Sequence, residues 1–176
     1  DAERGLIDRI VNEVWTEQGT AATITDVGEA LACELTDMSR DLATALAPYM
    51  VGGTYGRFFE GQASLDLDHD FTVFEMSDLA NREELRSVVL SAIMFMTSQA
   101  MTRSPRSVRK LLLIDEAWSM LKGGSMGDFV ETYARTCRKY GGALATATQS
   151  LNDYYKSDGA TAALENSDWM LILQQK

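Results

Sequence analysis

The sequence is poor in the residues that cross-link small folds or bind transition metals. It has two cysteines, Cys33 and Cys137, and one histidine, His69, in 176 residues. The cysteines are far apart and outside any C-x-x-C spacing, so they exclude a disulfide framework and favour a reducing compartment. A single histidine lacks the partners of a typical zinc site. No apolar run approaches the roughly 20 residues of a membrane span.

Positive charge is also scarce, and the acids are unevenly distributed. The formal net charge is −10, and residues 1–60 hold eleven acids and four bases, a net of −7. Binding to a nucleic-acid backbone needs clustered Lys and Arg, so nucleic acid is not expected as a partner of this part. Acids also surround His69, but without the glycine turn and distal Glu of a calcium loop; we predict a solvated loop there.

What the sequence does contain is material for a packed core. Hydrophobic residues make up 45% of the chain, which excludes a disordered protein. Residues 2–17, about 25–35 and 39–47 have apolar residues at helical spacing, with Ser39 as the expected N-cap of the third helix. We predict an all-α lobe over residues 1–56, with a hinge-like connection at its end, at Gly52-Gly53 and Gly56.

Strand patterns occur only after this lobe. Residues 111–114 form an aliphatic run, which predicts a strand buried on both faces. Further strands are predicted at 71–76, 143–149 and 169–173, with a possible edge strand at Phe58-Phe59. Helices are predicted at about 82–102, with a capping box from Asn81 to Glu84, and at 125–137, 150–155 and 160–165. A short helix is expected directly after Glu116. The alternation of strands and helices over residues 57–176 predicts an α/β part with parallel strands.

Two acids, Asp115 and Glu116, follow the central strand directly. Ligands of open α/β sheets bind at the carboxyl ends of the strands. One interpretation is therefore a Walker B strand, in which Asp115 holds Mg²⁺ and Glu116 deprotonates the attacking water. The alternative is a strand that runs into a helix start, where acids are favoured. Thr148-Gln149 closes the 143–149 strand, and we expect it to emerge at the same edge as the two acids.

Three segments in order, LLLIDEAW, ARTCRKYGG and ALATATQS, resemble the P-loop ATPases of conjugative type IV secretion, and especially the TraC-type pilus-assembly ATPases. The resemblance covers roughly residues 57–176. It implies a partial RecA-like parallel sheet with flanking helices, preceded by the small all-α lobe. It also implies ATP and Mg²⁺ as cofactors, other copies of the chain as partners in a hexamer, and inner-membrane secretion-channel components as docking partners. The expected location is cytoplasmic, peripheral at the inner membrane of a Gram-negative bacterium.

The resemblance also implies roles for individual residues. Asp115 would be the Mg²⁺-associated acid, Glu116 the catalytic base and Gln149 the sensor of the γ-phosphate. Arg138, or alternatively Arg135, would reach the nucleotide of a neighbouring subunit. For Arg135, a surface ion pair with Glu131 at i,i+4 is the simpler explanation.

One part of the family's site has no counterpart in the sequence. No G-x-x-x-x-G-K-[ST] occurs, and Gly52–Arg57 lacks both its spacing and its lysine. We therefore expect a fragment of a longer motor protein that by itself binds ATP poorly and does not hydrolyse it. Two alternatives remain for the intact protein: a DNA-pumping hexameric translocase of the related group, or a non-catalytic scaffold in which the two acids are structural.

Overall fold

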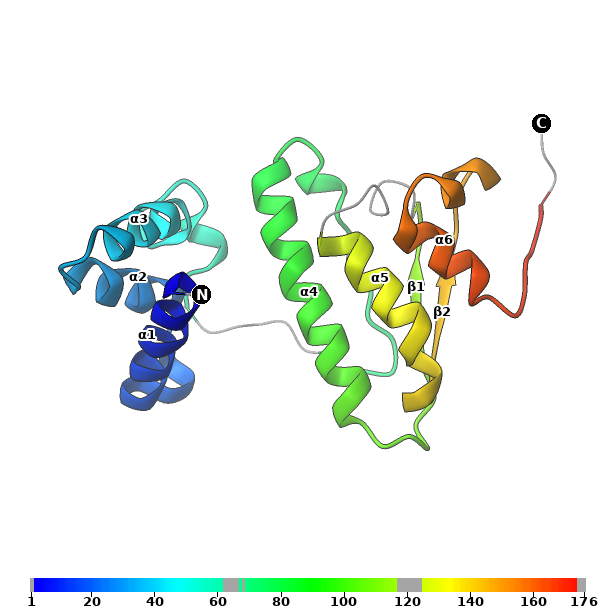
Figure 1. Ribbon diagram of the computed structural model, residues 1–176, viewed down its shortest axis with the longest axis horizontal. Helices are drawn as coiled ribbons and strands as arrows, with labels where there is room; N and C mark the ends of the chain where they lie inside the picture. The colour runs from blue at the N-terminus through cyan, green and yellow to red at the C-terminus, as the bar shows by residue number, and fades with distance from the viewer. Residues whose placement is uncertain (1, 62–66, 68, 117–124, 174–176) are drawn as a thin grey trace. The chain divides into compact units, whose positions relative to one another are not determined.

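The computed structural model describes residues 2–61, 67, 69–116 and 125–173. The chain forms two compact units, Asp1–Asp66 and Leu67–Lys176. Figure 1 shows helices alone in the first unit, and helices with a small sheet in the second.

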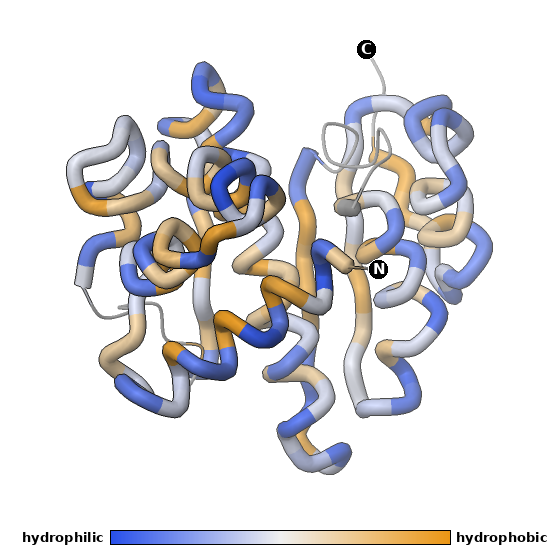
Figure 2. Tube along the Cα trace, turned by 60° about the vertical axis from the view of Figure 1, so that its left-hand side comes forward, coloured by the Kyte–Doolittle hydropathy of each residue, from blue (hydrophilic) through white to orange (hydrophobic). Residues whose placement is uncertain are grey.

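The first unit is helical throughout its described residues. Its elements are the helices α1 (Ala2–Gln18), α2 (Ile24–Cys33) and α3 (Asp37–Leu46), with the 3-10 turns η1 (Gly19–Ala21), η2 (Ala47–Tyr49) and η3 (Gly56–Phe58). Hydropathy alternates along the helices (Figure 2). The apolar stripes predicted from sequence meet in a core of Ile10, Val14 and Leu31. An apolar groove of about 510 Å³ lies along α1, α2 and α3.

Threonines are the N-caps of the second and third helices, and the third helix begins before the predicted Ser39. Thr23 and Asp26 form a capping box at the start of α2, and the Thr36 side chain accepts the Ser39 N–H at the start of α3. The predicted cap at Ser39 is therefore wrong. Ser39 lies within the first turn, fully buried, and its hydroxyl donates to the backbone carbonyl of Glu34.

The glycine-rich stretch after α3 is a packed turn and not the predicted hinge. A Cβ at Gly53 would overlap the Ala47 carbonyl, so this turn requires glycine. The predicted edge strand at Phe58-Phe59 is also wrong, because Phe58 ends η3. The Tyr49 ring contacts the Phe59 ring edge-on, with 5.6 Å between centroids. This contact places residues 57–60 with the first unit.

The second unit contains a parallel sheet of two described strands. Its elements in chain order are η4 (Ser77–Leu79), α4 (Glu83–Arg103), β1 (Lys110–Ile114), α5 (Ser125–Thr136), η6 (Cys137–Tyr140), β2 (Gly142–Thr146), η7 (Leu151–Tyr155) and α6 (Asp158–Glu165). β1 and β2 are paired in parallel, from Lys110 opposite Gly142 to Ile114 opposite Thr146. The predicted α/β class and parallel pairing are confirmed.

Helices cover one face of this sheet, with α5 against the strands (Figure 1). Val130 of α5 is fully buried against Ile114 of β1 and Ala160 and Ala163 of α6. A second cluster joins Met101 of α4 to Tyr133 and Cys137. The opposite face is open: Leu111 and Leu113 of β1 are exposed, so the prediction of a strand buried on both faces is wrong.

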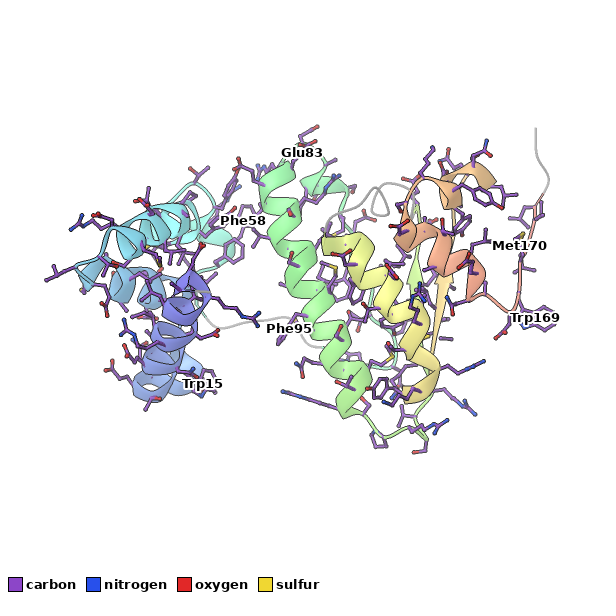
Figure 3. All side chains as sticks on the ribbon, viewed as in Figure 1. Trp15, Phe58, Glu83, Phe95, Trp169 and Met170 are labelled. Atoms are coloured by element: carbon purple, nitrogen blue, oxygen red, sulfur yellow. The ribbon has the colours of Figure 1, made fainter. Side chains whose placement is uncertain are left out.

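Two predicted strands are not formed. Residues 71–76 and 169–173 have no ladder partner among the described residues, and most of their apolar side chains are exposed. Figure 3 shows Trp169 and Met170 on the stretch that follows α6, and Trp169 is 87% exposed. Apolar, β-branched residues favour a strand, but the strand exists only where a neighbour supplies the hydrogen bonds.

The predicted capping box at Asn81 is wrong, because Arg82 is the N-cap of α4 and its side chain makes no capping hydrogen bond. The short helix expected directly after Glu116 lies outside the described residues.

Candidate functional site at the carboxyl ends of the parallel strands

The chain leaves the core directly after β1. Ile114 is the buried last residue of the strand, and the side chains of Asp115 and Glu116 that follow are exposed. The Glu116 N–H donates to Asp115 Oδ1 at 2.9 Å. This hydrogen bond joins the Asp115 carboxylate to the backbone of the turn between the two acids.

Glu116 has a backbone conformation that is uncommon for a side chain of its size. Its φ is +50°, and it is the single non-glycine residue with positive φ among those described. The left-handed region costs an L-residue roughly 1–2 kcal/mol. Strain of this kind gathers at functional sites, where the surrounding structure maintains it. Glu116 therefore combines the predicted catalytic position with a strained turn.

The neighbouring strand brings Gln149 to the same edge. The Ala147 N–H donates to the Ile114 carbonyl at 2.9 Å and extends the pairing beyond β2. Two residues later, Gln149 Nε2 donates to Glu116 Oε1 at 3.3 Å. The residues that follow the two strands, Glu116 and Gln149, therefore lie side by side, as the sequence predicts.

Sequence reasoning missed the side chains that secure the Gln149 loop. Thr148 Oγ1 donates to Asp153 Oδ2 at 2.6 Å, and Lys156 Nζ donates to Asp153 Oδ1 at 2.6 Å. These bonds, from Lys156 first and Thr148 second, lower the pKa of Asp153. Tyr154 also fastens the end of β2, because its hydroxyl donates to the Thr146 carbonyl at 3.1 Å. No short motif marks such contacts in the sequence.

The two candidate arginines lie at the other end of the sheet. Arg135 is in the last turn of α5 and pairs with Glu131, with 3.0 Å between Arg135 Nη2 and Glu131 Oε1. Arg138 is exposed in η6, which leads into the start of β2. β1 also begins there, as the Lys110 N–H donates to the Gly141 carbonyl at 3.3 Å. Neither arginine is therefore brought together with Asp115, Glu116 or Gln149 in the same chain.

The donor set at the strand ends suits a hard cation shared with phosphate. In phosphate sites Mg²⁺ takes one or two protein carboxylates and fills its octahedron with waters and phosphate oxygens. Asp115 and Glu116 supply carboxylate oxygens in an exposed position. Within the described ranges, no three His, Cys, Asp or Glu side chains gather as a protein-only metal cage. Nor does any helix in those ranges combine the length and apolarity needed to cross a membrane.

Comparison with known proteins gives consistent matches. The family described as TraG P-loop domain matches residues 34–176. Protein TraC of Escherichia coli K12 is 32% identical over 192 aligned residues, which cover 99% of this chain and 22% of TraC. The type IV secretion system protein virB4 of Bartonella henselae is 29% identical over 125 residues, covering 70% of this chain and 15% of virB4.

A solved structure shares the fold. VirB4 of Thermoanaerobacter pseudethanolicus superposes with a TM-score of 0.70 at 23% identity, over 94% of this chain and 50% of that one. The chain thus spans only part of each relative. Because the family model matches most of the sequence, and the described part has the parallel strands of an α/β fold, the chain belongs to the TraG P-loop domain family.

Proposed function

We propose that this chain is part of an ATP-hydrolysing motor that energises type IV secretion and conjugative pilus assembly. The observation that carries the proposal is the hydrogen bond from Gln149 to Glu116 at the carboxyl ends of two parallel strands. The names of the relatives, TraC and virB4 of a type IV secretion system, support the process in which the motor works.

Each residue at the strand ends has a distinct task in this proposal. Asp115 would hold Mg²⁺, which when bound would supply positive charge against the phosphates of ATP. Glu116 accepts a proton from the attacking water, and Gln149 orients that water or the γ-phosphate. Gln149 is suited to link the catalytic base to the γ-phosphate, because its side-chain amide can donate a hydrogen bond either to Glu116 or to a phosphate oxygen.

The Glu116→Gln substitution in the full-length protein tests the base. Glutamine keeps the size and the hydrogen-bonding oxygen but cannot take a proton at neutral pH. We expect turnover to fall roughly 10²–10⁴-fold, the usual contribution of a general base, while ATP binding is retained. Glu165→Gln, at the exposed end of α6, is the matched control and should keep full turnover. A Glu116→Gln variant that still supports secretion and pilus assembly at the unaltered level would favour a non-catalytic scaffold, and DNA-stimulated turnover of the unaltered protein would favour a DNA pump.

A second experiment tests whether an arginine acts between subunits. Arg138 lies at the end of the sheet away from Glu116, so any contribution to hydrolysis must be made to a neighbour's nucleotide. We expect Arg138→Ala to lower turnover, by as much as roughly 10³–10⁵-fold for an arginine supplied in trans. Mixed oligomers of Arg138→Ala and Glu116→Gln subunits should regain activity, because some interfaces then contain both intact groups. If Arg135→Ala is the inactive variant instead, the assignment passes to Arg135.

The proposed assembly is a homo-oligomer, a hexamer, that binds secretion-channel components at the cytoplasmic side of the inner membrane. A site completed by an arginine from a neighbour requires an oligomer of at least two subunits. Light scattering of the full-length protein with Mg-ATP measures its state. A monomer that hydrolyses ATP at the full rate would contradict the shared site.

A further inference from the structure

Asp153 is the only charged side chain that is buried among the described residues. It is 7% exposed, whereas its cationic partner Lys156 has a largely exposed side chain. A buried carboxylate is unfavourable unless its oxygens are paired, and both oxygens of Asp153 are paired here. Helix capping does not explain it, because Ser150 caps η7 and Ser157 caps α6.

The contacts of Asp153 close the loop that carries Gln149. On the side-chain side, Asp153 accepts the Thr148 hydroxyl at 2.6 Å. On the backbone side, the Asp153 N–H donates to the Ser150 carbonyl at 3.0 Å, and the Ser150 N–H reaches Thr148 Oγ1 at 3.4 Å. Gln149 lies between Thr148 and Ser150, so its backbone is held on both sides while its exposed side chain extends to Glu116.

We propose that Asp153 is a positioning residue that acts through Thr148 to hold Gln149 against Glu116. The inference rests on the proposed function, in which Gln149 takes part in hydrolysis. Gln149 contacts Glu116 by one 3.3 Å hydrogen bond, which by itself cannot fix a flexible side chain. The closed loop restricts the backbone from which that side chain extends, and a displacement of about 1 Å in a catalytic group can lower a rate by as much as 10²-fold.

The first test is a double-mutant cycle on turnover by the full-length protein. We expect Thr148→Val, which removes only the hydroxyl, and Asp153→Ala to lower kcat roughly 10-fold to 100-fold with little change in KM. Asp153→Asn, which can still accept the Thr148 hydroxyl, should recover part of that loss. Asp158→Ala, an exposed acid in the first turn of α6, is the control and should leave kcat unchanged.

The double-mutant cycle separates the positioning role of Asp153 from the catalytic role of Gln149 in the proposed function. In a Gln149→Ala background, Thr148→Val should lower kcat no further, because the positioned group is gone. An undiminished loss in that background overturns the positioning role of Asp153 and Thr148. Full turnover of Gln149→Ala alone overturns the role of Gln149 in the proposed function.

A second readout uses the 176-residue chain and does not depend on hydrolysis. The side-chain amide signals of Gln149 in an NMR spectrum should shift when Glu116 is replaced by glutamine. In a Thr148→Val background the same replacement should leave those signals in place, because Gln149 is no longer held against Glu116. Equal shifts in both backgrounds would contradict the inference, whether or not the full-length variants are active.

Discussion

Val130→Ala should destabilise the second unit by about 2 kcal/mol. Val130 is 0% exposed on α5 and packs between the end of β1 and α6, next to Ile114. The substitution removes two methyl groups, worth roughly 1.6 kcal/mol at about 0.8 kcal/mol for each buried group. Incomplete closure of the cavity adds to this loss. Ile114, the residue directly before Asp115, is therefore held in the core in part by this contact with Val130.

Cys137 provides an assay that reports on the second unit alone. Its thiol is buried, whereas the Cys33 thiol is exposed, so Cys33→Ser leaves one protected thiol in the chain. The two clusters of this unit share Leu112, Phe129 and Leu144, so loss of packing at Val130 should reach Cys137. A destabilisation of about 2 kcal/mol raises the opening equilibrium, and with it the labelling rate, roughly 30-fold.

The same substitution at an exposed site is the control. Val73 is 69% exposed in the second unit, and its replacement by alanine should change stability by no more than about 0.5 kcal/mol, or labelling by about twofold. Equal labelling rates for the Val130→Ala and Val73→Ala variants would refute the assignment of the core.

Three further predictions concern the ends of the sheet and the nucleotide. Gly141→Ala should destabilise the second unit by roughly 1–3 kcal/mol in the same thiol assay, because φ is +74° there and a Cβ would overlap the Arg106 carbonyl; Gly127→Ala, which meets nothing, should not. Because the pKa of Asp153 is lowered on folding, its contribution to stability is present above its ordinary pKa of about 3.9 and is lost as the pH falls through the folded value. Urea midpoints measured down to pH 3 should therefore fall less for Asp153→Asn than for the unaltered chain; parallel curves would contradict this. The 176-residue chain alone should bind Mg-ATP weakly, and a micromolar dissociation constant from titration calorimetry would count against that expectation.

Elements could be predicted from the sequence where their signal lies within one short segment. The aliphatic run before Asp115 and the small-residue strand before Gln149 predicted β1, β2 and the edge where they end, because strand and turn signals lie within the segments themselves. Stretches 71–76 and 169–173 have similar composition but form no strand, since pairing depends on neighbours distant in sequence. The bond between Thr148 and Asp153 was invisible for a related reason: side-chain contacts across an irregular loop follow no fixed spacing.

The roles of the three strand-end residues are tested most directly by a structure of the full-length protein with Mg²⁺ and a non-hydrolysable ATP analogue. We predict that the metal lies beside the Asp115 carboxylate, directly or through one water, and that the γ-phosphate lies between Glu116 and Gln149. A nucleotide bound elsewhere, with the hydrogen bond between Gln149 and Glu116 unchanged, would contradict the proposed site.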